Sequence, residues 1–270
     1  MKTLKLLAVL LLFIFSLNDL LSKEENNLLL FKPLIANVFE PRVGSFYQFS
    51  EEKLRLDIGA SYDLKHFTLS EISKLSVGAD FFTYTRLRTA GNFKFPVETS
   101  DYFFGVNSAL KTVMFEKDVS FRLRVAHISS HLVDGMAKDT IFSRMPFVYS
   151  REFVDLIIGV QQDNFRVYFG GTFLFHSIPD DFFILIPQIG VEYCLDLNNW
   201  LEFQFGLDVK AGLKNHLRNN YASQLGLLFR TNSNIGLYLG GYYFYGNSMH
   251  GMFYDVEDNY FGLGFQIIFY

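Results

Sequence analysis

The strongest constraint in this chain is a two-residue alternation of apolar and polar side chains that recurs along most of its length. The clearest example is the segment 200–210, which reads WLEFQFGLDVK. Because successive side chains of a β-strand point to opposite faces, this segment predicts a strand with one apolar and one polar face. Similar alternation is found in the segments 54–64, 75–81, 119–125, 165–175, 221–229 and 261–269.

Two architectures can bury the apolar faces of such strands. A soluble β-sandwich hides them between two sheets, whereas a transmembrane barrel turns them toward lipid and keeps the polar faces in its lumen. The connections favour the barrel, because short turns near 116–118, 162–164 and 196–199 alternate with longer links at 89–100 and 132–144. Outer-membrane barrels show this asymmetry between periplasmic turns and surface loops.

We therefore predict an all-β fold, a transmembrane antiparallel β-barrel of about twelve strands. The count includes a weaker strand at about 34–48. Aromatic side chains crowd the ends of the predicted strands, for example at 242–245, as the aromatic girdles of barrels do. The chain also ends on Phe269 and Tyr270. This ending resembles the terminal signal that the barrel-assembly machinery recognises, so we expect that machinery as a partner during biogenesis.

The first 22 residues predict a secretory signal peptide. Lys2 and Lys5 precede an apolar segment at 6–17, and Ser22 supplies a small residue at a plausible cleavage position. We expect residues 23–270 to form a single barrel domain in the outer membrane of a Gram-negative-type bacterium. Outer-membrane lipids are then its expected surroundings.

Composition excludes several other classes of protein. The longest uninterrupted apolar run has ten residues, about half of what a membrane-spanning helix needs. A single cysteine, Cys194, excludes a disulfide-stapled fold. A net charge of −4 without a basic block argues against nucleic acid as a partner.

The predicted lumen carries charges of both signs. This mixture suits a plug of salt-bridged side chains better than a ring that selects one sign of ion, although a strand number between small barrels and porins leaves a narrow channel open. A loop closed by residues 132 and 145 pairs Arg122 with Asp155. The charged residues on the lumen side are Asp57, Asp63, Lys65, Asp80, Arg122, Arg124, Asp155, Arg166, Glu192, Glu202, Asp208, Lys210 and Arg230.

One constellation has the residue types of a hydrolase. The alternation places His127 and Ser129 on the outward face, just before the long link at 132–144. A serine nucleophile needs a neighbouring base and a third group that orients the base. In the register above, His127 faces Ser150 and lies diagonal to Glu152, so we interpret Ser129, His127 and Glu152 as a candidate nucleophile, base and orienting group.

The residues that follow this pair are accessory candidates. Ser130, His131 and Asp134 can equally be interfacial polar residues that bond the link to the strand ends. His176 could join His131 and Asp134 as a metal site, but the spacing does not support one. We predict no metal and no cofactor.

The His-x-Ser pair resembles that of two families of outer-membrane lipid hydrolases, outer-membrane phospholipase A and the lipid A deacylases. The resemblance implies a pair on the outside of the barrel, aimed at acyl chains in the bilayer. Those families typically have Asn after the serine, whereas Ser130 and His131 follow Ser129 here. Only the pair itself is shared.

A broader resemblance covers most of the mature chain. The chain is similar to an uncharacterised family of outer-membrane β-barrel proteins, domain of unknown function 1207. A Glu-Pro-Arg element at 40–42 also fits that family. The resemblance implies a barrel and no activity. Its motifs are HISSHLVD (127–134), YSREFVDLIIG (149–159), RVYFGGTFLFHSIPDD (166–181) and GNSMHGMFYDVEDNYFGLGFQ (246–266).

Two functions of different classes follow from these patterns. The first is a structural or passive barrel at the outer membrane, including a narrow channel. The second is an acyl-ester hydrolase of the phospholipase A or lipid A deacylase type that acts on outer-leaflet lipids.

Overall fold

A computed structural model describes residues 29–138, 141–211, 219–231 and 235–269 of the chain. The predicted signal peptide, residues 1–22, lies outside this part. The described strands are β1 (Val43–Gln48), β2 (Lys53–Ser70), β3 (Ser73–Arg88), β4 (Val97–Met114), β5 (Lys117–Leu132), β6 (Ala137–Lys138), β7 (Ile141–Phe142), β8 (Tyr149–Gln162), β9 (Phe165–Ile178), β10 (Leu185–Asn198), β11 (Leu201–Lys210), β12 (Asn220–Arg230), β13 (Ile235–Asn247) and β14 (Glu257–Phe269). Two short 3-10 helices are η1 (Asp134–Met136) and η2 (Gly251–Phe253).

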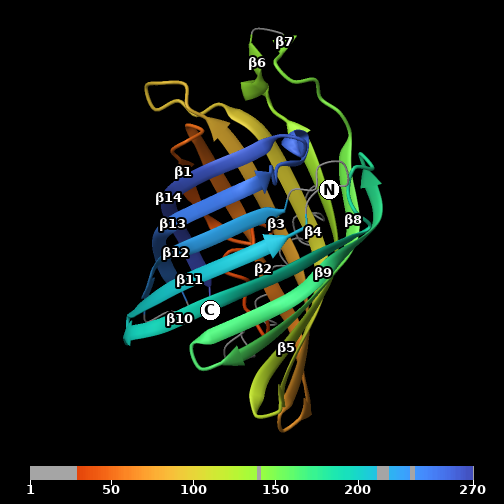
Figure 1. Ribbon diagram of the computed structural model, residues 1–270, viewed down its shortest axis with the longest axis vertical. Coiled ribbons are helices and arrows are strands. Elements are labelled where there is room, and N and C mark those ends of the chain that lie inside the picture. Colours follow the sequence, from red (N-terminus) through yellow and green to blue (C-terminus); the bar gives the residue numbers. More distant parts are fainter. Residues whose placement is uncertain (1–28, 139–140, 212–218, 232–234, 270) are drawn as a thin grey trace, which may run out of the picture.

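Twelve of these strands close an antiparallel barrel in the order β1-β14-β13-β12-β11-β10-β9-β8-β5-β4-β3-β2 (Figure 1). The remaining two, β6 and β7, pair with each other and project beyond the end of the barrel. The predicted fold class and strand number are thus confirmed. Within the described residues, no helix is long and apolar enough to span a membrane.

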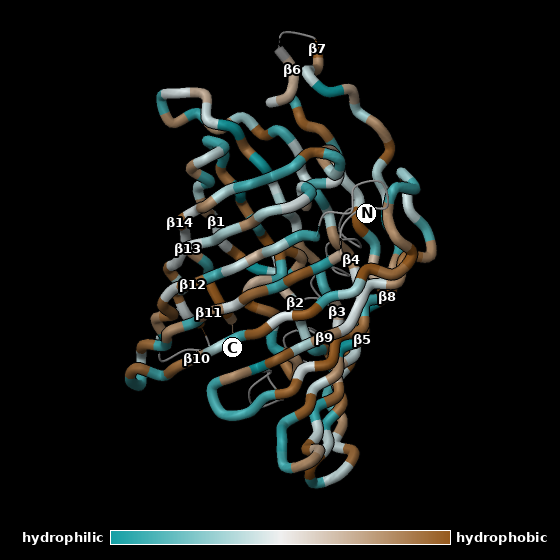
Figure 2. Tube along the Cα trace, in the orientation of Figure 1, coloured by the Kyte–Doolittle hydropathy of each residue, from teal (hydrophilic) through white to brown (hydrophobic). Residues whose placement is uncertain are grey.

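The alternation in the sequence becomes an inward and an outward face. In β11, Glu202, Gln204 and Asp208 are buried in the lumen, while Leu207 is exposed on the outside. Figure 2 shows the same interleaving of hydrophilic and hydrophobic residues along many of the strands. A polar inside and an apolar outside are the arrangement of a transmembrane barrel and the reverse of a soluble one.

The segment before β1 lies inside the lumen, which corrects the prediction of a strand over 34–48. Only Val43–Gln48 pairs with neighbouring strands, and residues 29–42 lie against the inner wall. Leu34 and Glu40 are each 1% exposed. Glu40 accepts two hydrogen bonds from Arg122, at 2.9 and 2.7 Å, and two from Arg124, at 3.4 and 3.0 Å. These bonds join Glu40 to two arginines of the wall and hold the segment 29–42 inside the barrel.

The predicted mixture of charges in the lumen is confirmed for most of its members. Asp80 pairs with Arg124 at 3.0 Å, and Arg166 donates to Glu192 at 2.6 Å. The prediction for Lys65 is wrong. An irregularity between Asp63 and Lys65 shifts the ladder by one residue, so that Lys65 is exposed on the outer face.

The register between β5 and β8 differs from the predicted one by two residues. Arg124 faces Asp155, and Arg122 faces Ile157. The ladder ends at the pair Ser130–Tyr149, because the link between the two strands holds η1 and the β6–β7 hairpin and is longer than predicted. A shift of two keeps every side chain on its face. Arg122 still reaches Asp155, at 3.5 Å.

The two ends of the barrel differ as predicted. One end has short turns, such as those between β4 and β5 and between β8 and β9. There Phe115, Glu116 and Asp163 adopt positive φ angles of 52°, 62° and 52°, as tight turns require. The other end carries the longer links β3–β4, β5–β8 and β13–β14. The candidate site lies near this second end.

Candidate functional site

The outward pair lies on β5 where the sequence places it. The neighbours Ile128 and Ser130 are buried, 3% and 2% exposed, whereas His127 and Ser129 are partly exposed on the opposite face. The ladders of β5 with β4 and β8 show no irregularity around these residues. The outward parity of His127 and Ser129 is therefore continuous with that of the apolar Leu123 and Val125, both exposed.

Glu152 on β8 lies directly across from His127 rather than diagonal to it. The distance from His127 Nδ1 to Glu152 Oε1 is 2.7 Å. The direct pairing follows from the two-residue register shift, which replaces Ser150 by Glu152 as the partner of His127. A carboxylate on Nδ1 keeps the proton on that nitrogen and presents Nε2 as the free acceptor of the ring.

Two further groups bind the same carboxylate. Ser150 Oγ donates to Glu152 Oε1 at 2.7 Å, and His176 Nδ1 forms a hydrogen bond with Glu152 Oε2. His176 reaches this position because of a bulge in β9. Glu152 pairs with His176, but the next residue pairs with Leu174, so Phe175 is extra. Both Phe175 and His176 are then exposed on the outer face. Strict alternation would turn His176 inward, and therefore this contact could not be predicted from the alternation.

Ser129 is flanked by Tyr102 on β4 and Ser150 on β8. Its hydroxyl forms no hydrogen bond with any residue that the structure describes. It shares a face with His127 two positions away, as a nucleophile would share it with its base. His127, Glu152 and Ser129 thus have the residue types and the common face of a Ser-His-acid set, with the His–acid contact formed.

The accessory candidates are not brought together. Ser130 faces the lumen, where its Oγ lies 3.3 Å from Thr99 Oγ1 and accepts the Met252 amide at 3.1 Å. His131 is exposed on the outer face and its ring contacts Tyr102 at 5.8 Å. Asp134 is exposed in η1. Across residues 29–269 as described, no group of three His, Cys, Asp or Glu side chains is arranged to hold a metal ion.

The surroundings of the pair are apolar on the side away from the links. Phe104 is 45% exposed, and its ring centroid lies 6.3 Å from that of His127. Val125 and Leu156 continue the exposed apolar surface toward the short-turn end. The polar cluster thus sits where an apolar outer band meets the longer links, and none of its residues lines the lumen cavities described below.

The closed barrel, its charged lumen and its apolar outside define a β-barrel membrane protein. The chain belongs to the family described as "Protein of unknown function (DUF1207)", whose sequence model matches residues 25–269. No curated protein matches the chain.

Solved structures of similar shape are outer-membrane phospholipases. Outer membrane phospholipase A from Escherichia coli has a TM-score of 0.55 and 12% identity, with 86% of this chain and 94% of that chain covered. An active-site mutant of the same enzyme has a TM-score of 0.57 and 11% identity, with 91% of this chain and 95% of that chain covered. The Salmonella typhi outer membrane phospholipase dimer with bound calcium has a TM-score of 0.57 and 13% identity, with 91% of this chain and 94% of that chain covered. Identities this low show the shared fold alone. The neighbours are outer-membrane proteins, which is consistent with an outer-membrane location for this chain.

Proposed function

We propose that this chain is exported by a cleaved signal peptide to the outer membrane of a Gram-negative-type bacterium and hydrolyses acyl esters of outer-leaflet lipids there. The observation that carries the proposal is the 2.7 Å contact between His127 Nδ1 and Glu152 Oε1 on the outside of the barrel. A buried or lipid-facing carboxylate such as Glu152, with its hydrogen-bonded partner, is costly on the outside of a barrel. A catalytic role explains why the pair is placed there, since the orienting acid, the base and a serine share one face of the barrel.

Each group has a definite role in this proposal. Glu152 orients His127 and stabilises its cation, His127 Nε2 takes the proton of Ser129 Oγ, and Ser129 Oγ attacks the ester carbonyl carbon. The tetrahedral intermediate collapses, the alcohol leaves with the proton from His127, and the acyl group remains on Ser129. Water, deprotonated by His127, then releases the fatty acid and restores the serine. Ser129 and His127 must approach within hydrogen-bond distance when substrate binds, as catalytic groups in unliganded enzymes often do.

The position of the site supports a membrane lipid as the substrate. The apolar surface around Phe104 and Val125 faces acyl chains, and the longer links face the water. Ester carbonyls of phospholipids and lipid A lie between these two regions. The three similar structures are those of outer-membrane phospholipases, and this supports the choice of lipid esters over water-soluble ones.

The lumen gives less support to the alternative, a passive narrow channel. Residues 29–42 fold inside the barrel, and Glu40 is bonded to two wall arginines. A cavity of about 670 Å³ remains toward the short-turn end. Leu34 and Glu40 line this cavity and are each 1% exposed, so the segment 29–42 narrows the lumen there.

The test is release of fatty acid from phospholipid and from lipopolysaccharide by the refolded, full-length protein. Calcium is present in one arm and chelated in the other, since one of the similar structures holds this ion. We expect release by the wild type and its loss in both Ser129→Ala and His127→Ala.

Two serine variants serve as controls. Ser100→Ala removes a hydroxyl that lies on the outer side of β4 near the same end, next to Thr85. Ser130→Ala removes the hydroxyl adjacent in sequence, which faces the lumen. Both should retain release. A correctly folded wild type that releases no fatty acid in either arm, or Ser129→Ala with full activity, would overturn the proposal.

A further inference from the structure

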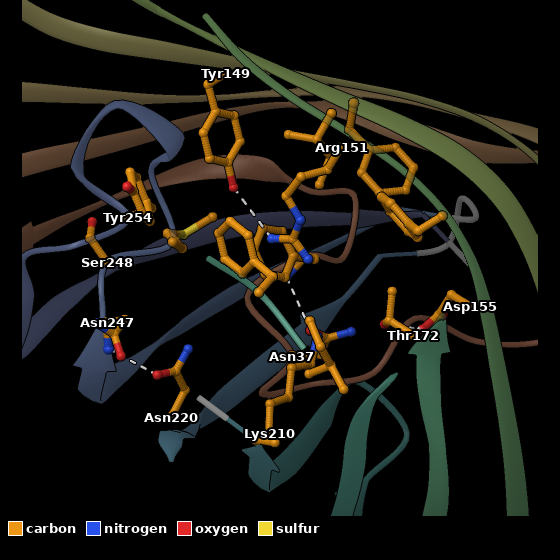
Figure 3. A pocket seen from close by; sticks show the side chains of 18 of the residues that line it. Asn37, Tyr149, Arg151, Asp155, Thr172, Lys210, Asn220, Asn247, Ser248 and Tyr254 are labelled. Atoms are coloured by element: carbon orange, nitrogen blue, oxygen red, sulfur yellow. Dashed lines mark hydrogen bonds between the residues drawn. The ribbon is translucent and has the colours of Figure 1, made fainter. Parts of the chain in front are cut away.

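A second polar site lies inside the barrel, under the longer links. It is a cavity of about 60 Å³ whose lining includes Arg151, Lys210, Asn220, Asn247 and Ser248 (Figure 3). A volume of roughly 10–15 Å³ by the same measure holds one water molecule. The cavity therefore has room for a few waters or for one small polyatomic ion.

Arg151 of β8 supplies a cation to this cavity. Its side chain is 7% exposed, and its guanidinium carbon lies 4.5 Å from the ring centroid of Phe182 and 6.0 Å from that of Phe39. It forms no ion pair with any carboxylate in the described part of the chain. Its one hydrogen bond there is a long one of 3.4 Å to the Tyr149 hydroxyl, and its buried Nε has no partner.

The other buried arginines of the lumen are bonded to carboxylates. Arg122 and Arg124 share Glu40, and Arg124 also pairs with Asp80. Burial of a cation is costly unless an anion and hydrogen bonds compensate it. The aromatic rings beside Arg151 orient its planar fork and attract its charge, but they leave its donors unsatisfied.

Lys210 of β11 adds a second cation. Its Nζ donates to Asn37 Oδ1 at 2.8 Å and lies 4.9 Å from the ring centroid of Phe39, and it pairs with no carboxylate among the described residues. Asp155 also lines the cavity. Its oxygens are engaged, because one accepts from Thr172 at 3.0 Å and the other lies 3.5 Å from Arg122.

The polar groups opposite the cations complete the lining. Asn220 Oδ1 accepts a hydrogen bond from the backbone N–H of Asn247 at 2.8 Å, which leaves the side-chain nitrogen of Asn220 for a ligand. Asn247 Oδ1 is buried without a partner. Tyr254 is committed elsewhere, since its hydroxyl donates to Asp181 at 2.6 Å. Burial and this hydrogen bond raise the pKa of Tyr254, so the hydroxyl keeps its proton and adds no negative charge to the cavity.

We infer that this cavity binds a small oxyanion, with phosphate as the best match. The guanidinium fork of Arg151 suits two oxygens of a tetrahedral or carboxylate anion, and Lys210 adds a point charge. A hydrogen phosphate also carries one O–H, which the free Asn247 Oδ1 can accept. The ion can come from free phosphate or from a phosphate ester, and the small volume favours the free ion.

The test is phosphate binding by the refolded full-length protein, measured by calorimetry and by ³¹P NMR line broadening at constant ionic strength. We expect saturable binding of one phosphate per barrel. Arg151→Met should weaken it at least about tenfold, the usual scale for a charge-assisted hydrogen bond. Wild-type protein that shows no saturable binding, or Arg151→Met with unchanged affinity, would overturn the inference.

Two further variants guard against a folding effect. Arg151→Lys keeps the charge and loses the fork, so it should fold and bind more weakly than wild type; equal affinity would contradict the role of the fork. Arg144→Gln removes a loop arginine that pairs with Asp255 at 2.5 Å, and it should bind like wild type.

A parallel titration with glycerol phosphate identifies the source of the ligand. Tighter binding than that of phosphate assigns a phosphate ester, and weaker binding assigns the free ion. Because the readout is binding, the result is independent of lipid hydrolysis.

Discussion

His250 Nδ1 lies 2.7 Å from Asp101 Oδ2, and the two side chains are 2% and 1% exposed. Asp101 belongs to β4, whereas His250 belongs to the link between β13 and β14, so the contact joins distant parts of the chain. The other carboxylate oxygen of Asp101 accepts the Gly251 amide at 2.7 Å, and Ser130 accepts the Met252 amide at 3.1 Å. Residues 248–256 are therefore fastened to the inner wall. The segments 127–134 and 246–266, separate in sequence, meet here.

Asp101→Asn should loosen this link without opening the barrel. The charge that holds His250 and the Gly251 amide is lost, and a buried hydrogen bond to a charged group contributes about 1.5–3 kcal/mol. We expect faster amide hydrogen exchange in 248–256 and little change in the strands. Asp255→Asn is the control, since it removes an exposed carboxylate of the same link that pairs with Arg144. Equal acceleration in both variants would contradict the role of Asp101.

Glu152→Gln should lower the turnover of lipid esters by about 10⁴-fold, the scale of the loss when the orienting acid of a Ser-His-Asp triad is replaced by its amide. The amide cannot stabilise the His127 cation that forms when Ser129 gives up its proton. The measurement is the rate of fatty-acid release at saturating lipid. His176→Gln is the matched control because it removes the other imidazole on the same carboxylate. It should change the rate far less than Glu152→Gln does, because Glu152 keeps its charge and its contact with His127.

Much of this fold is predictable because polar lumen residues and apolar outer residues alternate along each strand of a transmembrane barrel. The inward and outward sides of β5 and β11, and the outward pair of His127 and Ser129, follow from alternation alone. An error of two residues in the β5–β8 register left these faces intact. The same error moved Glu152 from a diagonal to a direct partner of His127. Face is thus a robust property of a strand sequence, whereas the cross-strand partner depends on the length of the link.

The parts that could not be predicted depend on breaks in the alternation or on contacts without a period. The extra residue Phe175 brings His176 to the outer face, and an irregularity next to Asp63 turns Lys65 outward. Neither irregularity can be predicted from the sequence, because the two extra residues, Phe175 and Leu64, are of types that are common in regular strands. The fold of 29–42 inside the lumen depends on long-range ion pairs of Glu40, which no local pattern reports.

Glu40→Gln should release residues 29–42 from the wall. Two buried arginines then lose their shared carboxylate, and loss of one partner of a buried ion pair costs about 3–5 kcal/mol. In planar bilayers we expect the wild type to show no stable conductance steps and the variant to show them. Asp118→Asn breaks an exposed pair with Lys111 at a short turn and should behave like wild type. Stable conductance steps in the wild type would instead favour the narrow-channel function.

Gly190→Ala should destabilise the barrel from within. Gly190 faces the lumen on β10, and a Cβ at this position would overlap the ring and the hydroxyl of Tyr168. Tyr168 is fully buried and donates to Asp208 at 2.7 Å, so displacement of its ring adds strain and leaves a buried carboxylate short of a donor. We expect a loss of about 2–4 kcal/mol in the free energy of unfolding, measured by urea titration of tryptophan fluorescence in detergent. Gly241→Ala is the control, because its Cβ would first meet the ring edge of Phe261 at 3.2 Å, on an exposed side chain that can move. Equal losses in the two variants would show that strand glycines matter here for backbone reasons and that the space beside Tyr168 does not.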